Sequence, residues 1–330
     1  MEKLLLSFLL GLGLTFLAGL VILPLLRKLR AGQQILSYVQ EHKSKSGTPT
    51  MGGVIFIVGL AAACLLTLRG DASLAYLSLA VTVGYGVVGF LDDFIKVFFK
   101  RNLGLRAYQK IVLQLGVALI VGFFAYNGRL VRGEFYLPFS GVYFEMGAWT
   151  VPFVVFIFLA TTNGVNLTDG MDGLAAGVTA AYMAAFAVIL FISAGSLDMS
   201  GFIVQAEEYL NLSVFSAVLT GALTAYLVFN VFPAKVFMGD TGSLALGGAA
   251  ACVAVLSKNS LLIPVVGLMF VVSVVSVIMQ VARYKLTKKR FFLMAPYHHH
   301  LQMKGMSEPR IACVYTVITL VMGVLAVCFG

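Results

Sequence analysis

Residues 173–197, GLAAGVTAAYMAAFAVILFISAGSL, contain no charged side chain. A helix must have about 20 predominantly apolar residues in a row to cross the hydrocarbon core of a bilayer. This stretch is therefore long enough to span a membrane, and it predicts that the chain is a membrane protein.

The composition of the whole chain agrees with this prediction. Of the 330 residues, 60% are hydrophobic and only 11% are charged, against about 25% charged in an ordinary soluble domain. So few charges exclude a soluble globule, and the many Phe and long aliphatic runs exclude a disordered chain. We predict a single all-α integral membrane domain over residues 1–330, with ten transmembrane helices. Nine further charge-free stretches supply the other spans: 4–26, 46–68, 72–91, 111–128, 146–168, 209–234, 241–257, 259–282 and 311–330.

The distribution of basic residues predicts the orientation of these helices. The loops after the odd-numbered spans carry 18 of the 23 Lys and Arg residues, and cytoplasmic loops are enriched in these residues. We therefore predict that these loops are cytoplasmic and that both termini face outward. The net charge of +9 then reflects membrane orientation, so it gives no support to a nucleic-acid partner.

Two of the outer loops are longer than the others. Residues 127–146 alternate apolar and polar side chains around Gly and Pro, which predicts a small periplasmic β-hairpin. Residues 194–210 are expected at the membrane interface. The four cysteines lie in separate apolar stretches without a paired spacing, which indicates packing residues and neither a zinc site nor disulfides.

The inner loops hold most of the side chains that can carry chemistry, and the first cluster is Asp92-Asp93. Two adjacent carboxylates at a membrane boundary repel each other and are costly to desolvate, so a cation is expected beside them. Lys96 and Lys100 follow on the helical face of Asp92, and Lys110 begins the next span. The cation is either a metal ion or one of these lysines.

The second cluster is the segment 163–173, NGVNLTDGMDG, between two apolar spans. Asn166, Asp169 and Asp172 recur every three residues and would share one face if the segment were helical. A plain turn would require the Gly and Asn residues but not two acidic residues beside lipid. The segment is interpreted as a binding loop, with a turn as the alternative.

The third cluster is the segment 230–243, NVFPAKVFMGDTGS. Asp240 opens an expected helix there, directly after Gly239. Backbone N–H groups at a helix start attract anions, and a carboxylate at that position can hold Mg²⁺. The alternative is that Asp240 serves only as the N-cap of the helix.

Two more polar segments lie in inner loops, namely PYHHH at 296–300 and KSGTPTMGG at 45–53. The histidines lack the spacing of a zinc site. In an extended segment His298 and His300 would share a side, and they suit hydrogen bonding to phosphate or carbohydrate unless they belong to a solvated loop. The segment 45–53 suits phosphate contact, although a turn at a helix start explains it too. The basic run 283–290 is interpreted as an anchor on anionic lipid.

All five polar clusters lie in loops that are expected on the cytoplasmic side. Hard oxygen ligands favour Mg²⁺ or Mn²⁺ over Zn²⁺, and the nearby basic residues suit phosphates. The combination is typical of metal-assisted phosphoryl transfer at a membrane face. The alternative from another class is a transporter, but its ionisable residues would lie near the centres of the spans, and these spans are charge-free.

In this order, the motifs resemble those of the phospho-N-acetylmuramoyl-pentapeptide transferases of bacterial cell-wall synthesis, over essentially the whole chain. The matching segments are GTPTMGG at 47–53, LDDF at 91–94, NLTDGMDGLA at 166–175, FMGDTGS at 237–243 and PYHHH at 296–300. One departure is Leu301-Gln302, where the family often has an aromatic residue and Glu. A sister family that uses UDP-N-acetylglucosamine is the nearest alternative, but GTPTMGG and PYHHH favour the muramoyl-pentapeptide branch.

The resemblance implies a multi-pass enzyme of the bacterial plasma membrane, with a cytoplasmic active site, Mg²⁺ and a homodimer. Its substrates would be UDP-N-acetylmuramoyl-pentapeptide and undecaprenyl phosphate, and its products lipid I and UMP. The lipid phosphate would attack the β-phosphorus directly, or an Asp nucleophile would first carry the phospho-sugar. The sequence leaves both routes open.

Roles for individual residues follow from the same resemblance. Asp240 is expected to be the leading Mg²⁺ ligand, with Asp93 near the metal. Asp92 is expected to engage or deprotonate the lipid phosphate, and His299 is a further catalytic candidate. Phe237 is expected to stack on uracil. The expected substrate-binding residues are Lys45, Thr50, Lys96, Lys110, Asn166, Asp169, Asp172, Asn230, Phe237, Gly239, His298 and His300.

Overall fold

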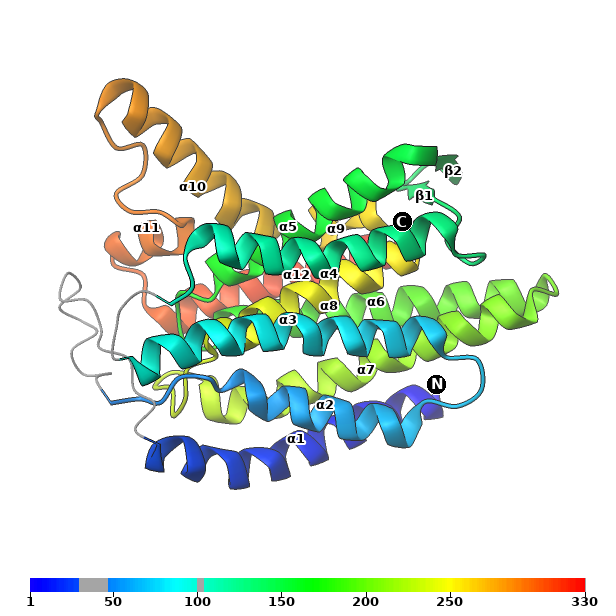
Figure 1. Cartoon of the computed structure of the whole chain (residues 1–330), viewed down its shortest axis with the longest axis horizontal. Coiled ribbons are helices and arrows are strands. Elements are labelled where there is room, and N and C mark those ends of the chain that lie inside the picture. Colours follow the sequence, from blue (N-terminus) through cyan, green and yellow to red (C-terminus); the bar gives the residue numbers. More distant parts are fainter. Residues whose placement is uncertain (30–46, 100–103, 330) are drawn as a thin grey trace.

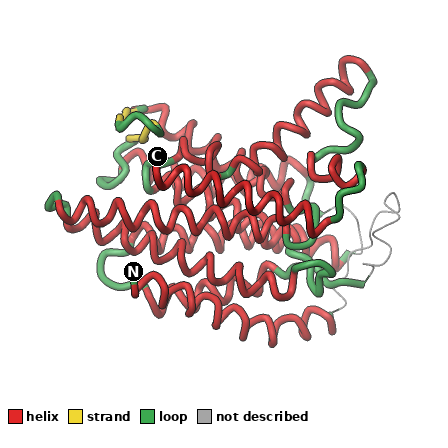
Figure 2. Tube along the Cα trace, turned by 180° about the vertical axis from the view of Figure 1, so that it is seen from behind, coloured by secondary structure: helices red, strands yellow, loops and turns green. Residues whose placement is uncertain are grey.

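The computed structural model describes residues 1–29, 47–99 and 104–329, which form a bundle of helices with one small hairpin (Figures 1 and 2). In this part of the chain nine helices are long and apolar enough to cross a membrane. They are α1 (Glu2–Lys28), α3 (Ser73–Phe98), α4 (Ala107–Asn127), α5 (Thr150–Thr168), α6 (Leu174–Met199), α7 (Ile203–Asn230), α8 (Gly239–Leu256), α10 (Leu268–Thr287) and α12 (Glu308–Phe329). The all-α membrane prediction is confirmed.

Two of the ten predicted spans differ from the observed helices. The window 46–68 contains α2 (Gly53–Thr67), which is apolar but has only 15 residues. The window 259–282 is divided into a 3₁₀ turn (Ser260–Leu262), α9 (Ile263–Val266) and α10. Gly267 separates the last two helices, and a side chain there would lie 2.7 Å from the carbonyl oxygen of Ile263. Beyond this break, α10 diverges from the bundle (Figure 1).

The predicted hairpin is present between α4 and α5. Its strands are β1 (Glu134–Leu137) and β2 (Val142–Glu145), which pair antiparallel. Lys258, just after α8, forms an ion pair with Glu134, and the carbonyl of Lys258 accepts a hydrogen bond from the backbone N–H of Tyr136 at 2.8 Å. The hairpin lies toward the same end of the bundle as the N and C marks in Figure 1. The side of the membrane that this end faces stays a prediction.

The shortest predicted span turns out to be the most buried of the nine long helices. Helix α8 is rich in Gly and Ala, and it packs between α3 and α5. A side chain at Gly247 would lie 2.5 Å from the Cα atom of Thr162, and one at Gly248 would lie 2.5 Å from the Tyr85 ring. Small residues permit this close approach of helices, which brings the start of α8 against the end of α3.

A buried carboxylate joins α7 to the start of α3. Glu208 is 4% exposed, and it accepts hydrogen bonds from the backbone N–H groups of Ser73 and Leu74, at 3.1 and 2.9 Å. It also accepts one from the Ser73 hydroxyl. The first N–H groups of a helix have no partner within the helix. Glu208 therefore caps α3 from a neighbouring helix.

The variant Glu208→Ala is expected to lose about 1–3 kcal/mol of stability, because the N–H groups of Ser73 and the buried Leu74 lose their acceptor. Thermal unfolding of the purified protein in detergent measures this loss. The neighbouring variant Glu207→Ala is the control, because the carboxylate that caps α3 is that of Glu208. Equal melting temperatures for the two variants would contradict the capping role.

Candidate active site

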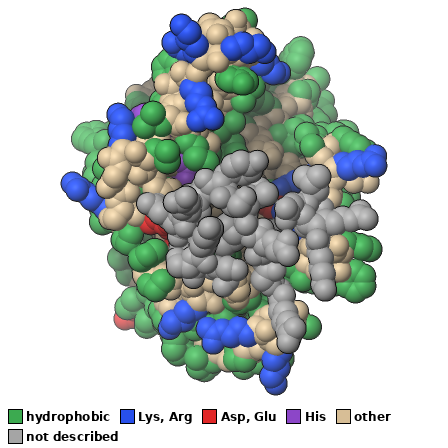
Figure 3. Space-filling view, turned by 90° about the vertical axis from the view of Figure 1, so that its left-hand side faces the viewer, with side chains coloured by type: hydrophobic (Ala, Val, Ile, Leu, Met, Phe, Trp, Pro, Cys, Tyr) green, Lys and Arg blue, Asp and Glu red, His purple; other side chains and the backbone are tan. Residues whose placement is uncertain are grey.

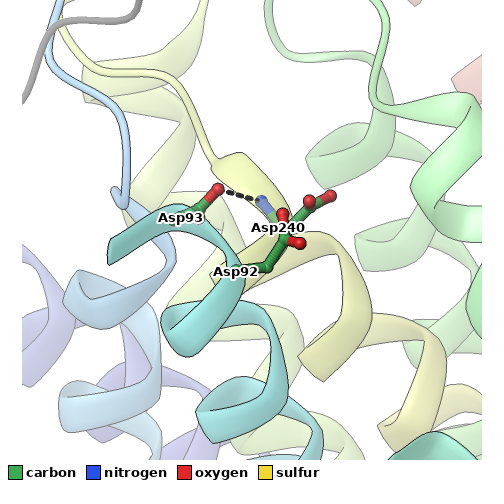
Figure 4. Close-up of side chains that lie close together, drawn as sticks. All are labelled: Asp92, Asp93 and Asp240. Carbon is green, nitrogen blue, oxygen red and sulfur yellow. Dashed lines mark hydrogen bonds between the residues drawn. The ribbon is translucent and has the colours of Figure 1, made fainter. Parts of the chain in front are cut away.

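Three carboxylates meet where the end of α3 lies against the start of α8 (Figure 4). Asp92 and Asp93 come from α3, and Asp240 lies in the first turn of α8. Each offers an oxygen atom within 4.8 Å of the others. Asp92 and Asp93 are buried, whereas the side chain of Asp240 retains 15% of its exposure. The structure thus joins the first and third polar clusters into one acidic site.

Asp93 holds the start of α8 in place. Its carboxylate accepts hydrogen bonds from the backbone N–H groups of Asp240, at 3.2 Å, and Thr241, at 2.9 Å. The Thr241 hydroxyl donates a third, at 2.7 Å. The alternative that Asp240 is only an N-cap is therefore wrong, since Asp93 caps this helix and Asp240 lies inside its first turn. The capping leaves the Asp240 carboxylate directed toward other groups.

Two lysines neutralise part of the acidic charge. Lys96 Nζ lies 2.5 Å from Asp92 Oδ2 and 2.6 Å from Asp240 Oδ2. Lys110 Nζ lies 3.2 Å from the same oxygen of Asp240. The alternative that a lysine pairs with Asp92 is borne out by Lys96, whereas Lys110 pairs with Asp240 and Lys100 falls outside the described residues. Three carboxylates against two ammonium groups leave one negative charge at the site, which a bound cation would offset.

Asn166 adds a neutral donor from α5. Its side-chain N–H₂ group donates to Asp240 Oδ1 at 2.5 Å and to the Ser243 hydroxyl at 2.8 Å. Ser243 and Thr241 were not among the predicted site residues. Ser243 lies three residues after Asp240, on the same helix face, whereas the Thr241 hydroxyl donates to Asp93 from another helix.

The segment after Asn166 is not the continuous helix that would place the second cluster on one face. Helix α5 ends at Thr168, so Asp169 and Asp172 lie in the turn before α6. The helix stops there because Gly170 and Gly173 follow, and Gly173 has φ +74°. Burial raises the pKa of Asp169 well above its ordinary value, and the negative charges of Asp240, Asp93 and Asp172 add to that effect.

Asp172 and Asn230 support the backbone around the site. Asp172 Oδ2 accepts a hydrogen bond from the backbone N–H of Ala234 at 3.0 Å. The Asn230 side chain accepts one from Gly173 N–H at 3.1 Å and donates one to the Val236 carbonyl at 3.0 Å. These contacts tie the turn between α5 and α6 to the segment that leads into α8.

The described part of the segment 45–53 lies against the segment 230–243. The backbone N–H of Phe237 donates to the Pro49 carbonyl at 2.8 Å, and the Phe237 carbonyl accepts from Gly52 N–H at 2.9 Å. Thr50 is buried, and Phe237 and Gly239 are partly exposed. Lys45 lies outside the described residues. The segment 49–53 therefore borders the acidic site through backbone pairing.

The three histidines lie on a short helix, α11 (Tyr297–Met303), so the extended arrangement considered for them is wrong. His298 is fully buried, and neither ring nitrogen has a hydrogen-bond partner among the described residues. Burial, with a smaller effect of His299, lowers the pKa of His298 to about 3. A side chain at Gly170 would lie 2.2 Å from Nε2 of His298 and 3.2 Å from Nε2 of His299. His298 and His299 thus face the turn that carries Asp169.

The whole site lies at one end of the bundle. Figure 3 looks onto that end, where blue Lys and Arg side chains are spread around the rim. The N and C marks lie toward the opposite end (Figure 1). Carboxylates, ammonium groups, an amide and imidazoles at one end of an apolar bundle can hold a metal ion and an anionic substrate together.

Comparison with known proteins agrees with the motifs. The model of glycosyl transferase family 4 matches residues 74–258, and phospho-N-acetylmuramoyl-pentapeptide-transferase signature 1 matches residues 45–57. A phospho-N-acetylmuramoyl-pentapeptide-transferase of Clostridium novyi (strain NT) is 41% identical over 323 residues, or 98% of this chain and 95% of the relative. One of Desulfitobacterium hafniense (strain DSM 10664 / DCB-2) is 43% identical over 332 residues, or 99% and 97%. This chain therefore belongs to the family of phospho-N-acetylmuramoyl-pentapeptide transferases.

Proposed function

We propose that this chain transfers phospho-N-acetylmuramoyl-pentapeptide from UDP-N-acetylmuramoyl-pentapeptide to undecaprenyl phosphate, giving lipid I and UMP, with Mg²⁺ at the acidic site. The shared name of the relatives supports the reaction. The observation that carries the metal assignment is the approach of Asp92, Asp93 and Asp240 within 4.8 Å.

The donor set fits Mg²⁺, since carboxylate oxygens are the ligands that this hard cation prefers. Asp240 would be the leading ligand, because its side chain is the more exposed and its partners are side chains that can move aside, whereas the buried Asp93 is held by the backbone at the start of α8. Asp93 would fix the position of Asp240, and Asn166 would orient its carboxylate. When bound, Mg²⁺ would supply positive charge that neutralises the pyrophosphate and the leaving UMP.

The protein's own groups would align the two reactants. In a direct displacement, an oxygen of the lipid phosphate forms the new bond to the β-phosphorus, and the bond to the UMP oxygen breaks. Asp92 would engage the acceptor phosphate, and Lys96 and Lys110 would hold phosphate oxygens once the donor substrate enters. An ionised phosphate requires little base catalysis, so positioning is the main task of Asp92 in this proposal.

The same proposal extends to location and assembly. The multi-pass fold fits a bacterial membrane enzyme, and the excess of basic residues in the odd-numbered loops supports a cytoplasmic active site. We also propose that the protein is a homodimer, which the family resemblance supports. The mass of the purified protein in detergent, corrected for bound detergent, tests it.

The reaction is tested by UMP release from the purified chain with polyprenyl phosphate and Mg²⁺. UDP-N-acetylmuramoyl-pentapeptide is expected to be used about tenfold or more in preference to UDP-N-acetylglucosamine when both are present, because a site built for the larger polar group discriminates against its absence. Equal use of the two UDP-sugars, or preference for UDP-N-acetylglucosamine, would favour the sister reaction. Accumulation of substrate in proteoliposomes without UMP release would instead revive the transporter alternative.

A further inference from the structure

The hairpin between α4 and α5 has one apolar and one polar face. Successive side chains of a strand point to opposite faces, so the register of β1 and β2 assigns every side chain to a face. The apolar face carries Phe135, Leu137, Val142 and Phe144. The other face carries Glu134, Tyr136, Tyr143 and Glu145. All the charged side chains of the two strands therefore lie on one face of the hairpin.

The apolar face packs on protein near the bundle and is exposed toward the tip. Phe135 is fully buried, and the centroid of its ring lies 5.0 Å from that of Phe153 on α5. Leu137 and Val142 lie on the same face, nearer the tip, and they are 45% and 53% exposed. The face that covers α5 thus continues beyond the protein surface, and its outer part points in the same direction as the buried part.

The turn at the tip carries a third exposed apolar side chain. Phe139 is 58% exposed, and its backbone is left-handed, with φ +65°. This conformation is uncommon for residues other than Gly and is an outlier for a bulky one. Contact with water gives an aromatic ring no compensation for it, whereas burial of the ring in an apolar medium does. The tip therefore suits an apolar medium.

The hairpin lies at the level of the helix ends. In Figure 1 its strands lie about as far along the bundle as the N and C marks, and the turn between α6 and α7 reaches farther. Close to the C mark, α12 still exposes the apolar side chains of Val324 and Phe329. Exposed apolar side chains of a spanning helix face lipid, so this level is still within reach of the bilayer.

The length of α8 agrees with this level. It has 18 residues and is therefore about 27 Å long, slightly less than the hydrocarbon core of about 30 Å. Lys258 follows its end. The ammonium group of Lys258 pairs with Glu134, and its carbonyl accepts from the backbone N–H of Tyr136. A helix this short has its polar end at or below the headgroups, and the hairpin that covers this end shares its depth.

We propose that the hairpin is a membrane-interface element, whose tip inserts Leu137, Phe139 and Val142 among the lipid chains while its charged face points to water. The partner of this surface is the bilayer itself, since the exposed apolar patch continues the exposed surface of the spanning helices. Trp149 lies at the base of the hairpin, where α5 begins, and is 72% exposed. Trp is enriched at membrane–water interfaces, and Trp149 belongs to the same surface.

Tryptophan fluorescence of the full-length protein in lipid nanodiscs tests the proposal. Trp149 is the only tryptophan of the chain, so its depth is measured without a substitution. Bromine on a lipid chain quenches an indole that it touches, and iodide quenches from water. Since interfacial elements insert about 5–10 Å into the boundary between headgroups and chains, we expect bromine near the headgroup to quench at least about twofold more than bromine at the chain end. Quenching by iodide alone would overturn the proposal.

Two variants in a Trp149→Phe background measure the depth of the tip. In Phe139→Trp and Val142→Trp we expect strong quenching by bromine near the headgroup and little by iodide. The opposite order would place the tip in water and would overturn the proposal. Protection from both quenchers would mean that protein covers the tip, in a second copy or another partner, and would overturn it as well.

Glu145→Trp in the same background is the matched control, because Glu145 is exposed on the polar face of the same hairpin. We expect iodide to quench this variant more strongly than bromine does, which is the reverse of the order in Phe139→Trp. Melting temperatures of the variants in detergent, compared with that of the native chain, verify that they are folded. Equal quenching of Glu145→Trp and Phe139→Trp by bromine would contradict insertion through the apolar face.

Discussion

The variant Asp240→Asn is expected to release UMP about 10²-fold more slowly than the native chain, or slower still. Its carboxylate contacts three other residues of the site, Lys96, Lys110 and Asn166. An amide in its place removes one negative charge and replaces the leading carboxylate ligand with a neutral, weaker one. Electrostatic stabilisation by one such group typically contributes at least this factor to the rate. Initial rates at increasing Mg²⁺ concentration measure the effect.

A matched variant controls for changes in charge and solubility. Asp198 is exposed near the end of α6, away from the acidic site, so Asp198→Asn is expected to keep the native rate. If Asp240→Asn also keeps the native rate at every Mg²⁺ concentration, Asp240 does not hold the metal. Full activity of the native chain in EDTA would contradict the metal assignment as a whole.

A second large effect is expected from Gly89→Leu, which acts on the packing beneath the site. A side chain at Gly89 would lie 2.0 Å from the carbonyl oxygen of Asp240 and 2.6 Å from the nitrogen of Thr241. Backbone atoms of a packed helix cannot yield, so α3 and α8 must separate. This separation would weaken the capping of α8 by Asp93. Misplacement of a reacting group by about 1 Å costs about 10² in rate.

Activity and stability are both measured for this variant. UMP release is expected to fall about 10²-fold, and overpacking is expected to cost about 1–3 kcal/mol of stability. Gly116→Leu on α4 is the control, because a side chain at Gly116 meets no atom within 4 Å. If Gly89→Leu matches this control in rate and melting temperature, the contact between α3 and α8 is not what positions Asp240.

The membrane spans could be predicted from the sequence because each depends on a local property. About 20 consecutive apolar residues are enough for a span, whatever packs around them. The hairpin was predicted from the alternation of apolar and polar side chains in residues 127–146, which is also a local property. The break at Gly267 and the short helix α11 could not be predicted in this way. Gly267 and Pro296 are local signals that a helix can end or begin nearby, but they do not fix which residues form it.

The candidate site was predictable in composition but not in geometry. The motifs identified Asp92, Asp93 and Asp240 as chemistry-bearing residues, yet no local pattern indicates that Asp93 caps a helix that begins 146 residues later. The hydroxyl groups of Thr241 and Ser243 were missed for a related reason, since their importance depends on Asp93 and Asn166 from other helices. Such contacts become visible only when the packing of α3, α5 and α8 is known.

Asp240 and its two neighbouring carboxylates are proposed as a site for a divalent cation. Electron paramagnetic resonance of Mn²⁺ added to the purified protein tests it most directly, because free and bound Mn²⁺ give different signals. We expect saturable binding of one Mn²⁺ per chain in the native protein, competed by Mg²⁺ and lost in Asp240→Asn. Binding of Mn²⁺ to Asp240→Asn with the native affinity and stoichiometry would contradict the proposed site.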